Sequence, residues 1–408
     1  FSHAPNLVPA VGYAVPPCSG APYLQDNIMS TDAFWLHASA VLLDGQLQQN
    51  QYLLINNGLI EQISADKPDS DTIQQLTHGV LLPGFIDTQV NGGGGVLFNQ
   101  QPSSAALHCM MQAHSRFGTT AMLPTVISDD IIVMQQAADT VSAAIKQGQA
   151  GIIGIHFEGP HLSTTKRGCH PAARLRPVSD DELALYQRDD LGVRLLTVAP
   201  ECVSPRQISQ LVSRGVIVSL GHSNANAATV QAALDAGARG FTHLYNGMSA
   251  LTSREPGMVG CALADPRAYC GIILDGEHLH PLAARVALNA KGAARLMLVT
   301  DAMSPVGSDE TEFSFFDGKV VRNGMQLTNQ QGSLAGSVLD MASAVQYAAT
   351  VLQAGLVKAV QMATATPAAF IGQSAVRGSI AEGKRADLVW LTDAGKVQHC
   401  WIAGQLQQ

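Results

Sequence analysis

The chain has 408 residues, of which 46% are hydrophobic, and it contains 38 glycines and 19 prolines. This composition is typical of a compact globular enzyme and excludes a fibrous or an intrinsically disordered protein. The formal net charge is −8 without a dense block of lysines and arginines, so neither nucleic acid nor an anionic membrane surface is an expected partner.

Seven cysteines are scattered along the chain, and no two of them have C-x-x-C spacing. This distribution indicates free thiols in a reducing compartment, so we expect the protein in the cytoplasm. No stretch of the sequence has the length and apolarity of a membrane span.

Residues 1–28 are rich in proline, alanine and polar residues, and they show neither helical nor strand periodicity. They also lack the basic start and the apolar core of a signal peptide. We therefore expect a leader or a segment derived from an expression vector, with Met29 as the natural start.

The following segment and the end of the chain consist of short runs with the alternation typical of strands. Asp44–Gly45 and Asn57–Gly58 separate the first runs and are typical of hairpin turns. Isolated hairpins are barely stable in water, so we expect residues 29–82 and 383–408 to pair into one small β-sandwich domain. The expected strands are Phe34–Ala38, Ala40–Leu43, Tyr52–Asn56, Leu59–Gln62, Leu388–Leu391 and Val397–Ile402.

Between these ends, residues 83–382 alternate strand-like apolar runs with amphipathic or alanine-rich helical stretches such as 227–236 and 282–291. This alternation predicts a parallel sheet, and eight such runs predict an α/β fold with a (β/α)8 TIM-type barrel. The expected barrel strands are Phe85–Asn91, Thr119–Thr125, Ile152–Glu158, Val193–Glu201, Val216–His222, Ala238–Leu244, Cys270–His278 and Arg295–Ala302.

Three of these runs carry, at or next to their ends, a side chain of a type that can bind metal ions, namely Glu158, His222 and His243. A single histidine is more often a buried structural residue than a ligand. One carboxylate and two imidazoles at the same face of one barrel instead predict one divalent metal ion with an open coordination position. We expect zinc, and iron(II), cobalt and manganese are the alternatives that these ligands accept.

Asp301 directly follows the last apolar run, Leu296–Thr300. One interpretation is a helix N-cap, since an aspartate before Ala302 could cap a following turn. The alternative is a general base beside a metal-activated water, which then acts as a general acid towards the leaving group. We favour the second interpretation because the residue lies at the same barrel face as the predicted ligands.

Eight motifs follow one another in chain order, within a resemblance that runs from about Phe34 to Trp401: Leu82–Asp87, His156–Pro160, Gly221–Ser223, Thr242–Met248, Arg254–Gly257, Asp275–His278, Val299–Ala302 and Leu334–Ser337. The first resembles the first-strand signature of the amidohydrolase superfamily. Together they resemble the N-acetylglucosamine-6-phosphate deacetylases of that superfamily. Such an ordered series is not expected from a chance match to one motif.

The resemblance implies a role for each matching residue. It implies that Glu158, His222 and His243 bind the metal and that Asp301 is the catalytic acid and base. It also implies that His170 positions and polarises the acetamido group of the substrate. The further substrate contacts that it implies are Cys169, Asn246, Gly247, the phosphate-binding residues Arg254 and His278, and the sugar-covering residues Leu334 and Ala335. In this family Arg254 and His278 can come from a neighbouring subunit, so the expected assembly is a homodimer.

The sequence departs from the superfamily at the end of the first barrel strand. Most amidohydrolases carry His-x-His there and bind a second metal, but this chain has Gln89 and Asn91. Amide side chains are poor zinc ligands compared with imidazole. We therefore expect one tightly bound metal, with Gln89 and Asn91 as vestigial positions of a second site.

The predicted reaction is hydrolysis of the acetamido group of N-acetyl-D-glucosamine 6-phosphate to D-glucosamine 6-phosphate and acetate. Metal-bound water is the expected nucleophile, with Asp301 as general base and acid. Two alternatives stay open. A related amidohydrolase could act on N-acetylgalactosamine 6-phosphate or a cyclic amide, and a catalytically silent barrel could serve in binding; the retained Asp301 argues against the silent barrel.

Overall fold

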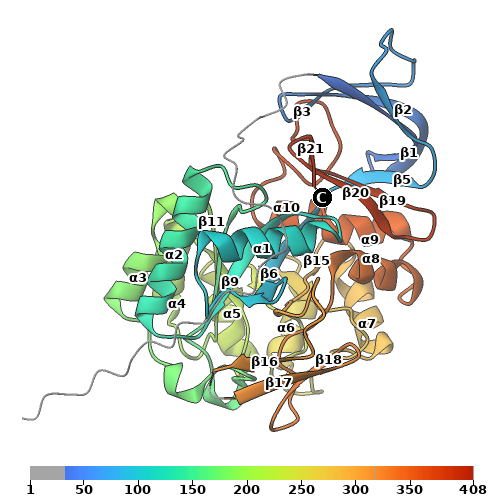
Figure 1. Cartoon of the computed structure of the whole chain (residues 1–408). Helices are drawn as coiled ribbons and strands as arrows, with labels where there is room; N and C mark the ends of the chain where they lie inside the picture. Colours follow the sequence, from blue (N-terminus) through green and yellow to red (C-terminus); the bar gives the residue numbers. More distant parts are fainter. Residues whose placement is uncertain (1–32, 317, 408) are drawn as a thin grey trace, which may run out of the picture.

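The computed structural model describes residues 33–316 and 318–407. A barrel of parallel strands surrounded by helices makes up most of the molecule, and a separate sheet lies at one end of it (Figure 1). The expected leader at residues 1–28 lies outside the described residues. Among the helices of the described part, none is long and apolar enough to cross a membrane.

The eight barrel strands each overlap one of the eight runs expected from the sequence, and each pairs in parallel with its neighbour in chain order. The predicted fold class is therefore confirmed. The barrel strands are β6 (Phe85–Val90), β9 (Thr119–Ile127), β10 (Gly154–Glu158), β11 (Val193–Val198), β12 (Ile217–Leu220), β13 (Gly240–Phe241), β14 (Tyr269–Ile272) and β15 (Leu296–Leu298).

The barrel closes where the chain leaving β15 meets β6. The buried carboxylate of Asp87 accepts hydrogen bonds from the backbone N–H of Thr300 at 3.3 Å and from its hydroxyl at 2.5 Å. Next to them, the N–H of Asp301 donates to the carbonyl oxygen of Gln89 at 3.0 Å. These contacts join the first strand to the last and place Asp301 beside Gln89.

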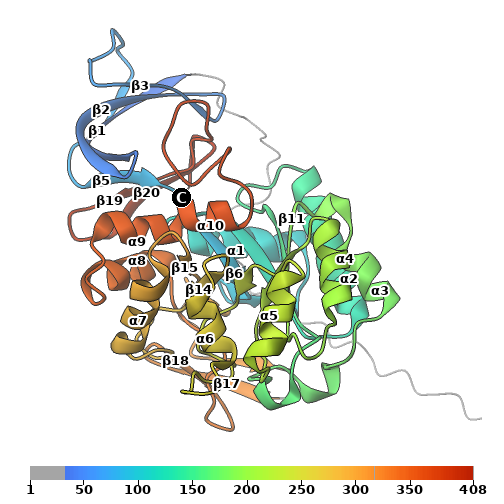
Figure 2. The same ribbon diagram turned by 180° about the vertical axis from the view of Figure 1, so that it is seen from behind.

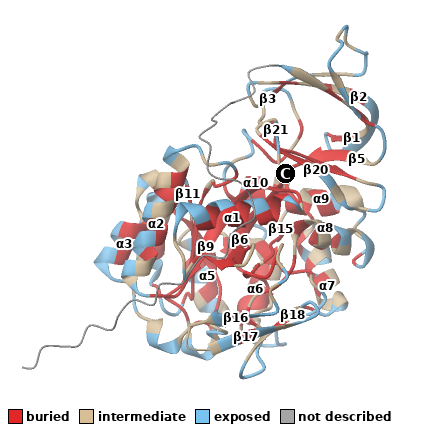
Figure 3. Cartoon of the chain, viewed as in Figure 1, coloured by how far each residue is buried: buried red, intermediate tan, exposed pale blue. Residues whose placement is uncertain are grey.

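Helices cover the outside of the barrel, as Figure 2 shows from behind. In α2 the buried residues Met134, Ala137 and Val141 recur at helical spacing, so one face packs inward against β10. Figure 3 shows the same pattern, with buried strands inside and helices buried on one side only. The helices are α1 (Ser104–Ser115), α2 (Ile131–Lys146), α3 (Asp180–Tyr186), α4 (Pro205–Ser213), α5 (Ala227–Asp235), α6 (Gly257–Ala264), α7 (Pro281–Lys291), α8 (Met341–Thr350), α9 (Leu356–Ala363) and α10 (Ala365–Phe370).

The two ends of the chain build the separate sheet, as the sequence predicts. In this sheet β19 from the C-terminal end pairs with β5, and β5 pairs with β1. Asp44 and Asn57 are the first central residues of the two hairpin turns, and their φ values of 47° and 49° are positive, as such turns require. The strands are β1 (Phe34–Leu43), β2 (Gln46–Asn56), β3 (Leu59–Ser64), β4 (Ile73–Leu76), β5 (Val80–Pro83), β19 (Leu388–Leu391), β20 (Val397–Ile402) and β21 (Gln405–Leu406).

The small core of this sheet also includes Ile380. The core thus crosses the predicted boundary at residue 383, and the domain limits 29–82, 83–382 and 383–408 stay predictions.

One sheet was not expected from the sequence. Three antiparallel strands follow the last barrel strand: β16 (Glu312–Phe315), β17 (Gly318–Asn323) and β18 (Gln326–Asn329). In Figures 1 and 2 they lie at the end of the barrel opposite the terminal sheet. A two-stranded ribbon, β7 (Gly92–Gly93) and β8 (Val96–Leu97), follows β6.

The closure at Asp87 predicts a pH dependence of stability. Burial raises the pKa of Asp87 from 3.8 to about 7, although hydrogen bonds from Thr300 and Gln89 oppose the shift. The folded chain therefore binds more protons than the unfolded chain between these values. The stabilisation from this group is fully present below about pH 4 and is lost as the pH rises through about 7.

Asp87→Asn keeps the shape of the side chain and removes the titration. We expect the loss of thermal stability between pH 5 and pH 8 to be smaller in this variant than in the wild type. Thermal unfolding of chelator-treated protein measures it, because metal loss at low pH then does not contribute. Asp69→Asn, which removes an exposed charge, is the control. Equal pH slopes for wild type and Asp87→Asn would refute the assignment.

Candidate metal centre and active site

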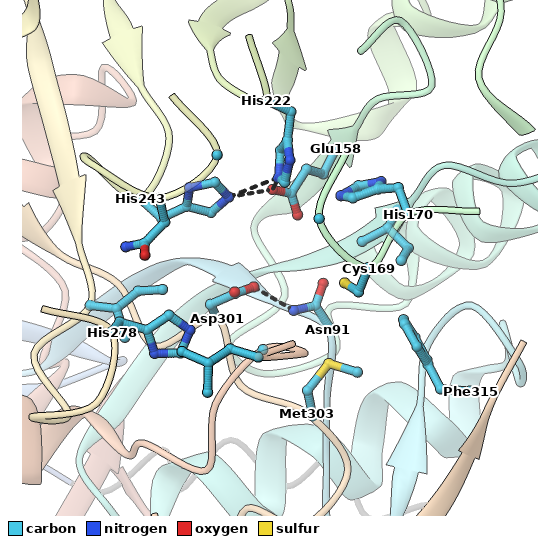
Figure 4. Close-up of a pocket in the computed structure, with 17 residues that line it drawn as sticks. Asn91, Glu158, Cys169, His170, His222, His243, His278, Asp301, Met303 and Phe315 are labelled. Carbon is cyan, nitrogen blue, oxygen red and sulfur yellow. Dashed lines mark hydrogen bonds and ion pairs between the residues drawn. The ribbon is translucent and has the colours of Figure 1, made fainter. Parts of the chain in front are cut away.

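A pocket opens at the carboxyl ends of the barrel strands, at the end of the molecule that carries β16–β18. This is the face at which barrel enzymes place their active sites. Figure 4 shows the side chains that converge on it. The lining residues are Asn91, Ile127, Glu158, Gly168, Cys169, His170, His222, His243, Asn246, Gly247, Ile273, His278, Asp301, Met303, Phe315, Leu334 and Gly336.

Glu158, His222 and His243 meet in this pocket as a compact triad, which we call the ligand triad. They follow or end β10, β12 and β13, and their ligand atoms all lie within 4.8 Å of one another. His222 Nε2 lies 3.2 Å and His243 Nε2 lies 3.0 Å from the same carboxylate oxygen, Oε1 of Glu158. All three residues are at most 6% exposed. The strand order thus brings together three residues that are far apart in sequence.

The donor and acceptor pattern of the triad fits a bound cation. His222 Nδ1 lies 2.8 Å from the carbonyl oxygen of Lys166, which can only accept, so Nδ1 carries the proton. In the neutral ring, Nε2 then presents a lone pair to the carboxylate oxygen of Glu158. Two lone pairs at 3.2 Å repel each other unless a positive charge lies between them, either a proton on Nε2 or a bound metal ion. One carboxylate and two imidazole nitrogens are a donor set that suits a divalent ion such as zinc.

The charges of the triad are coupled. Burial by itself raises the pKa of Glu158, but hydrogen bonds and charges from His222 and His243 hold it well below its ordinary value. Burial lowers the pKa of His243, yet the hydrogen bond to Glu158 and the nearby carboxylates raise it overall. The triad therefore favours a carboxylate that is ionised and paired with positive charge.

The backbone is strained at the two histidines of the triad and at Asp301. His222, His243 and Asp301 have φ values of 48°, 33° and 52°. These values lie in the left-handed region, which is unfavourable for most residues other than glycine and asparagine. Such conformations cost about 1–3 kcal/mol each and persist where the surroundings enforce them. They turn the three side chains from the strand ends into the pocket.

Asp301 lies beside the triad and is held by two amide side chains. Gln89 Nε2 donates to Asp301 Oδ1 at 3.1 Å and to Glu158 Oε2 at 3.2 Å, and Asn91 Nδ2 donates to Asp301 Oδ1 at 2.7 Å. Both amides therefore direct N–H groups, not oxygen lone pairs, at the carboxylates. Burial and the charge of Glu158 raise the pKa of Asp301 to about 6, despite the opposing charges of His243 and His278. The side chain is no helix cap, because the residues after it form no helix.

His170 and Cys169 form another wall of the pocket. Burial lowers the pKa of His170 to about 3, so the ring is neutral. Its Nδ1 lies 2.8 Å from the hydroxyl oxygen of Ser128, and its ring packs edge-on against that of His222. If the Ser128 hydroxyl donates, Nε2 of His170 is a neutral donor. Burial raises the pKa of the Cys169 thiol to about 12, which leaves it protonated.

The opposite wall carries polar groups suited to a substrate. Asn246 Nδ2 is buried without a hydrogen-bond partner among the described residues, as is Asn91 Oδ1. His278 is oriented by Asp275, whose carboxylate lies 2.6 Å from its Nδ1 and also accepts its backbone N–H at 2.9 Å. Gly247 lies beside them in the lining.

Two expected substrate residues do not line the pocket of the single chain. Arg254 is exposed in the loop before α6, and Ala335 is fully buried behind the lining residue Leu334. Their predicted roles in phosphate binding and in covering the sugar therefore stay predictions.

The sequence did not point to the apolar part of the wall. Ile127, Ile273, Met303 and Phe315 line the pocket, and Figure 4 shows Met303 and Phe315 across the cavity from His222. Phe315 ends β16, so the hairpin signal Asn323–Gly324 that follows could have identified this sheet. No sequence signal separates these apolar side chains from ordinary core residues.

The chain matches known proteins along most of its length. Residues 80–406 match the family model described as Amidohydrolase family. The N-acetylgalactosamine-6-phosphate deacetylase of Shewanella sp. (strain ANA-3) is 63% identical over 370 residues, which cover 90% of this chain and 94% of the relative. The N-acetylglucosamine-6-phosphate deacetylase of Bacillus subtilis (strain 168) is 34% identical over 361 residues, with 86% and 91% covered.

Solved structures agree with this relationship. The crystal structure of N-acetylglucosamine-6-phosphate deacetylase from Pasteurella multocida superposes with a TM-score of 0.89 at 31% identity. The match covers 92% of this chain and 99% of that chain. The resemblance inferred from the motifs is confirmed.

The ligand triad predicts the metal content of the protein. We expect about one tightly bound divalent ion per chain, because among the described residues this is the one group of three metal-binding side chains. Glu158→Gln removes the anionic ligand at unchanged shape and should reduce the content to a small fraction.

Elemental analysis of purified protein measures this content. Asp301→Asn is the matched control, since it removes a nearby carboxylate outside the triad and should retain the metal. Two tightly held ions in the wild type, or normal content in Glu158→Gln, would contradict the expectation.

Proposed function

We propose that this chain, which belongs to the amidohydrolase family, hydrolyses the acetamido group of an N-acetylhexosamine 6-phosphate to the amino sugar phosphate and acetate. The observation that carries the proposal is the buried ligand triad beside Asp301 at the mouth of the barrel. Relatives and solved structures with names of this activity cover nine tenths of the chain and support it.

Glu158, His222 and His243 would hold the divalent ion, with zinc as the proposed metal. When bound, such an ion polarises an amide carbonyl and lowers the pKa of water at its open position. The chain itself supplies the buried, negatively charged cradle that retains the cation.

Asp301 moves the protons of the reaction. In the metal-free chain, burial raises its pKa to about 6, towards the range in which a carboxylate is both an effective base and an effective acid. It accepts a proton from the attacking water as the new carbon–oxygen bond forms. It then gives that proton to the nitrogen as the carbon–nitrogen bond breaks, which yields acetate and the amine.

Gln89 and Asn91 keep Asp301 in place for both steps. Their N–H groups hold Oδ1, so Oδ2 remains available to the substrate side of the pocket. The ring of His170 is neutral, and when the Ser128 hydroxyl donates to its Nδ1, its Nε2 N–H is suited to the oxygen of the acetamido group as negative charge develops on it.

The phosphate end of the substrate is proposed to lie towards His278 and Asn246. Asp275 orients the imidazole of His278, and the unpartnered Nδ2 of Asn246 offers a further donor. The exposed position of Arg254 is compatible with a homodimer in which this guanidinium reaches the neighbour's site. The assembly and a cytoplasmic location stay part of the proposal.

Two epimers are candidate substrates. The relative at 63% identity is named for N-acetylgalactosamine 6-phosphate, which favours that sugar. The Bacillus relative and the Pasteurella structure are named for N-acetylglucosamine 6-phosphate, the substrate predicted from the motifs. The two sugars differ only at the C4 hydroxyl, remote from the acetamido group.

Acetate release from both sugar phosphates, and from both sugars without phosphate, tests the proposal. We expect higher kcat/KM for the galacto epimer, and a loss of about 10²-fold or more without phosphate because charged hydrogen bonds disappear. Chelation should abolish activity and added zinc should restore it. Failure to release acetate from either sugar phosphate with metal-loaded protein would rule out the function.

Asp301→Asn tests the proton transfer. Without the base, kcat should fall by about 10²–10⁴-fold while metal content and thermal stability stay near wild type. Steady-state kinetics and elemental analysis on the same preparation measure these quantities. Turnover near that of the wild type would exclude Asp301 as the acid and base.

A further inference from the structure

A row of polar side chains crosses the barrel interior beneath the ligand triad. One side chain comes from each of five consecutive strands, β9 to β13 or the residue directly after, and all are at most 5% exposed. We call this row the polar belt; its members are Thr125, His156, Thr197, Ser219 and Thr242. Buried polar groups are costly unless they are fully hydrogen-bonded, so the belt needs an explanation.

The belt is one continuous chain of hydrogen bonds. His156 Nδ1 lies 3.2 Å from Thr125 Oγ1, and His156 Nε2 lies 2.8 Å from Thr197 Oγ1. Thr197 Oγ1 lies 2.7 Å from Thr242 Oγ1, which lies 2.7 Å from Ser219 Oγ. The belt therefore links all five strands through side chains alone.

Only one direction of hydrogen-bond donation along the belt gives every donor an acceptor. Thr125 donates to the carbonyl of Leu123 at 3.3 Å, so it must accept the proton on His156 Nδ1. His156 Nε2 then accepts from Thr197, which leaves Thr197 to accept from Thr242. In the reverse direction the proton of Ser219 would have no acceptor among the described residues. The belt is thus a fully satisfied network with one arrangement.

Each ligand lies within three residues of a belt residue along the chain. Glu158 is two residues after His156 in β10, so both point to the same face of the strand. His243 directly follows Thr242, and His222 follows Ser219 by three residues. The belt therefore forms the layer that supports all three ligands.

Thr197 is the central connection. It belongs to β11, which supplies no ligand, yet its hydroxyl joins His156 on one side to Thr242 on the other. Two strands, β11 and β12, separate β10 from β13 in the sheet. Backbone pairing between neighbouring strands therefore does not by itself fix the distance across the barrel interior between His156, near Glu158, and Thr242, next to His243. The Thr197 hydroxyl bridges that gap.

We infer that Thr197 is a positioning residue for the metal: through the polar belt it holds the ends of β10, β12 and β13 at the separation that a divalent ion requires. This inference rests on the proposed function, since it takes the triad to bind a metal. Removal of the hydroxyl should leave the fold intact and all three ligands in place. The triad should nevertheless loosen, because the hydrogen-bonded bridge beneath it is broken.

The test is the apparent dissociation constant for Zn²⁺ of the full chain, measured by competition with a chromogenic chelator. Thr197→Val replaces the hydroxyl by a methyl group of similar size and should weaken Zn²⁺ binding about 10-fold, the lower end of the effect of outer partners on metal affinity. Thr197→Ser keeps the hydroxyl and should restore binding close to that of the wild type. The visible spectrum of Co²⁺-loaded Thr197→Val should also shift, which loss of stability alone would not cause.

Thr120→Val is the matched control. Thr120 is also a buried threonine, and its hydroxyl donates to the carbonyl of Phe85 at 3.2 Å near the start of β9, at the far end of the barrel. We expect a similar loss of thermal stability but unchanged Zn²⁺ affinity. If Thr197→Val does not fold, Thr242→Val breaks the same bridge and should give the same weakening.

Two results would overturn the inference. One is that the wild type binds Zn²⁺ tightly and a folded Thr197→Val binds it with the same dissociation constant. The other is that Thr120→Val weakens Zn²⁺ binding as much as Thr197→Val does. A wild type that does not bind Zn²⁺ would instead refute the metal site of the proposed function, and the inference with it. The wild-type measurement therefore separates the two failures.

Discussion

The contact between His222 and Glu158 determines what this barrel can do. The imidazole donates its Nδ1 proton to the carbonyl of Lys166, and its other nitrogen faces a carboxylate oxygen. A positive charge between these two atoms, either a proton on Nε2 or a bound metal ion, makes the contact attractive, and His243 provides the third ligand atom. The burial of Glu158, which would otherwise be costly, is explained by this pairing with positive charge.

The barrel topology converts separate sequence motifs into one site. Parallel strands place the residues that follow them at one face, and positive φ values turn His222, His243 and Asp301 into the pocket. Both the barrel closure at Asp87 and the polar belt lie directly beneath these turns. The hydrogen bonds of the Asp87 closure and of the polar belt thus hold the strained backbone at the strand ends in place. Stability and site geometry therefore depend on the same contacts.

Much of this arrangement could be predicted from the sequence. Alternating strand and helix periodicity gave all eight barrel strands, and Glu158, with the two histidines, was recognisable as a strand-end residue. The sheet β16–β18 and its pocket residue Phe315 were missed, because short exposed strands after a barrel have weak periodicity. Arg254 lies exposed in the single chain, so its proposed contact with a neighbouring subunit and the proposed C4 preference are not determined by the sequence pattern alone.

The most direct measurement is anomalous scattering at the zinc edge from crystals of the metal-loaded protein. We predict one strong peak among the ligand atoms of Glu158, His222 and His243, with the Gln89 amide still turned towards Asp301. Two peaks bridged by Glu158, or a metal bound elsewhere with the triad empty, would contradict a single-metal site.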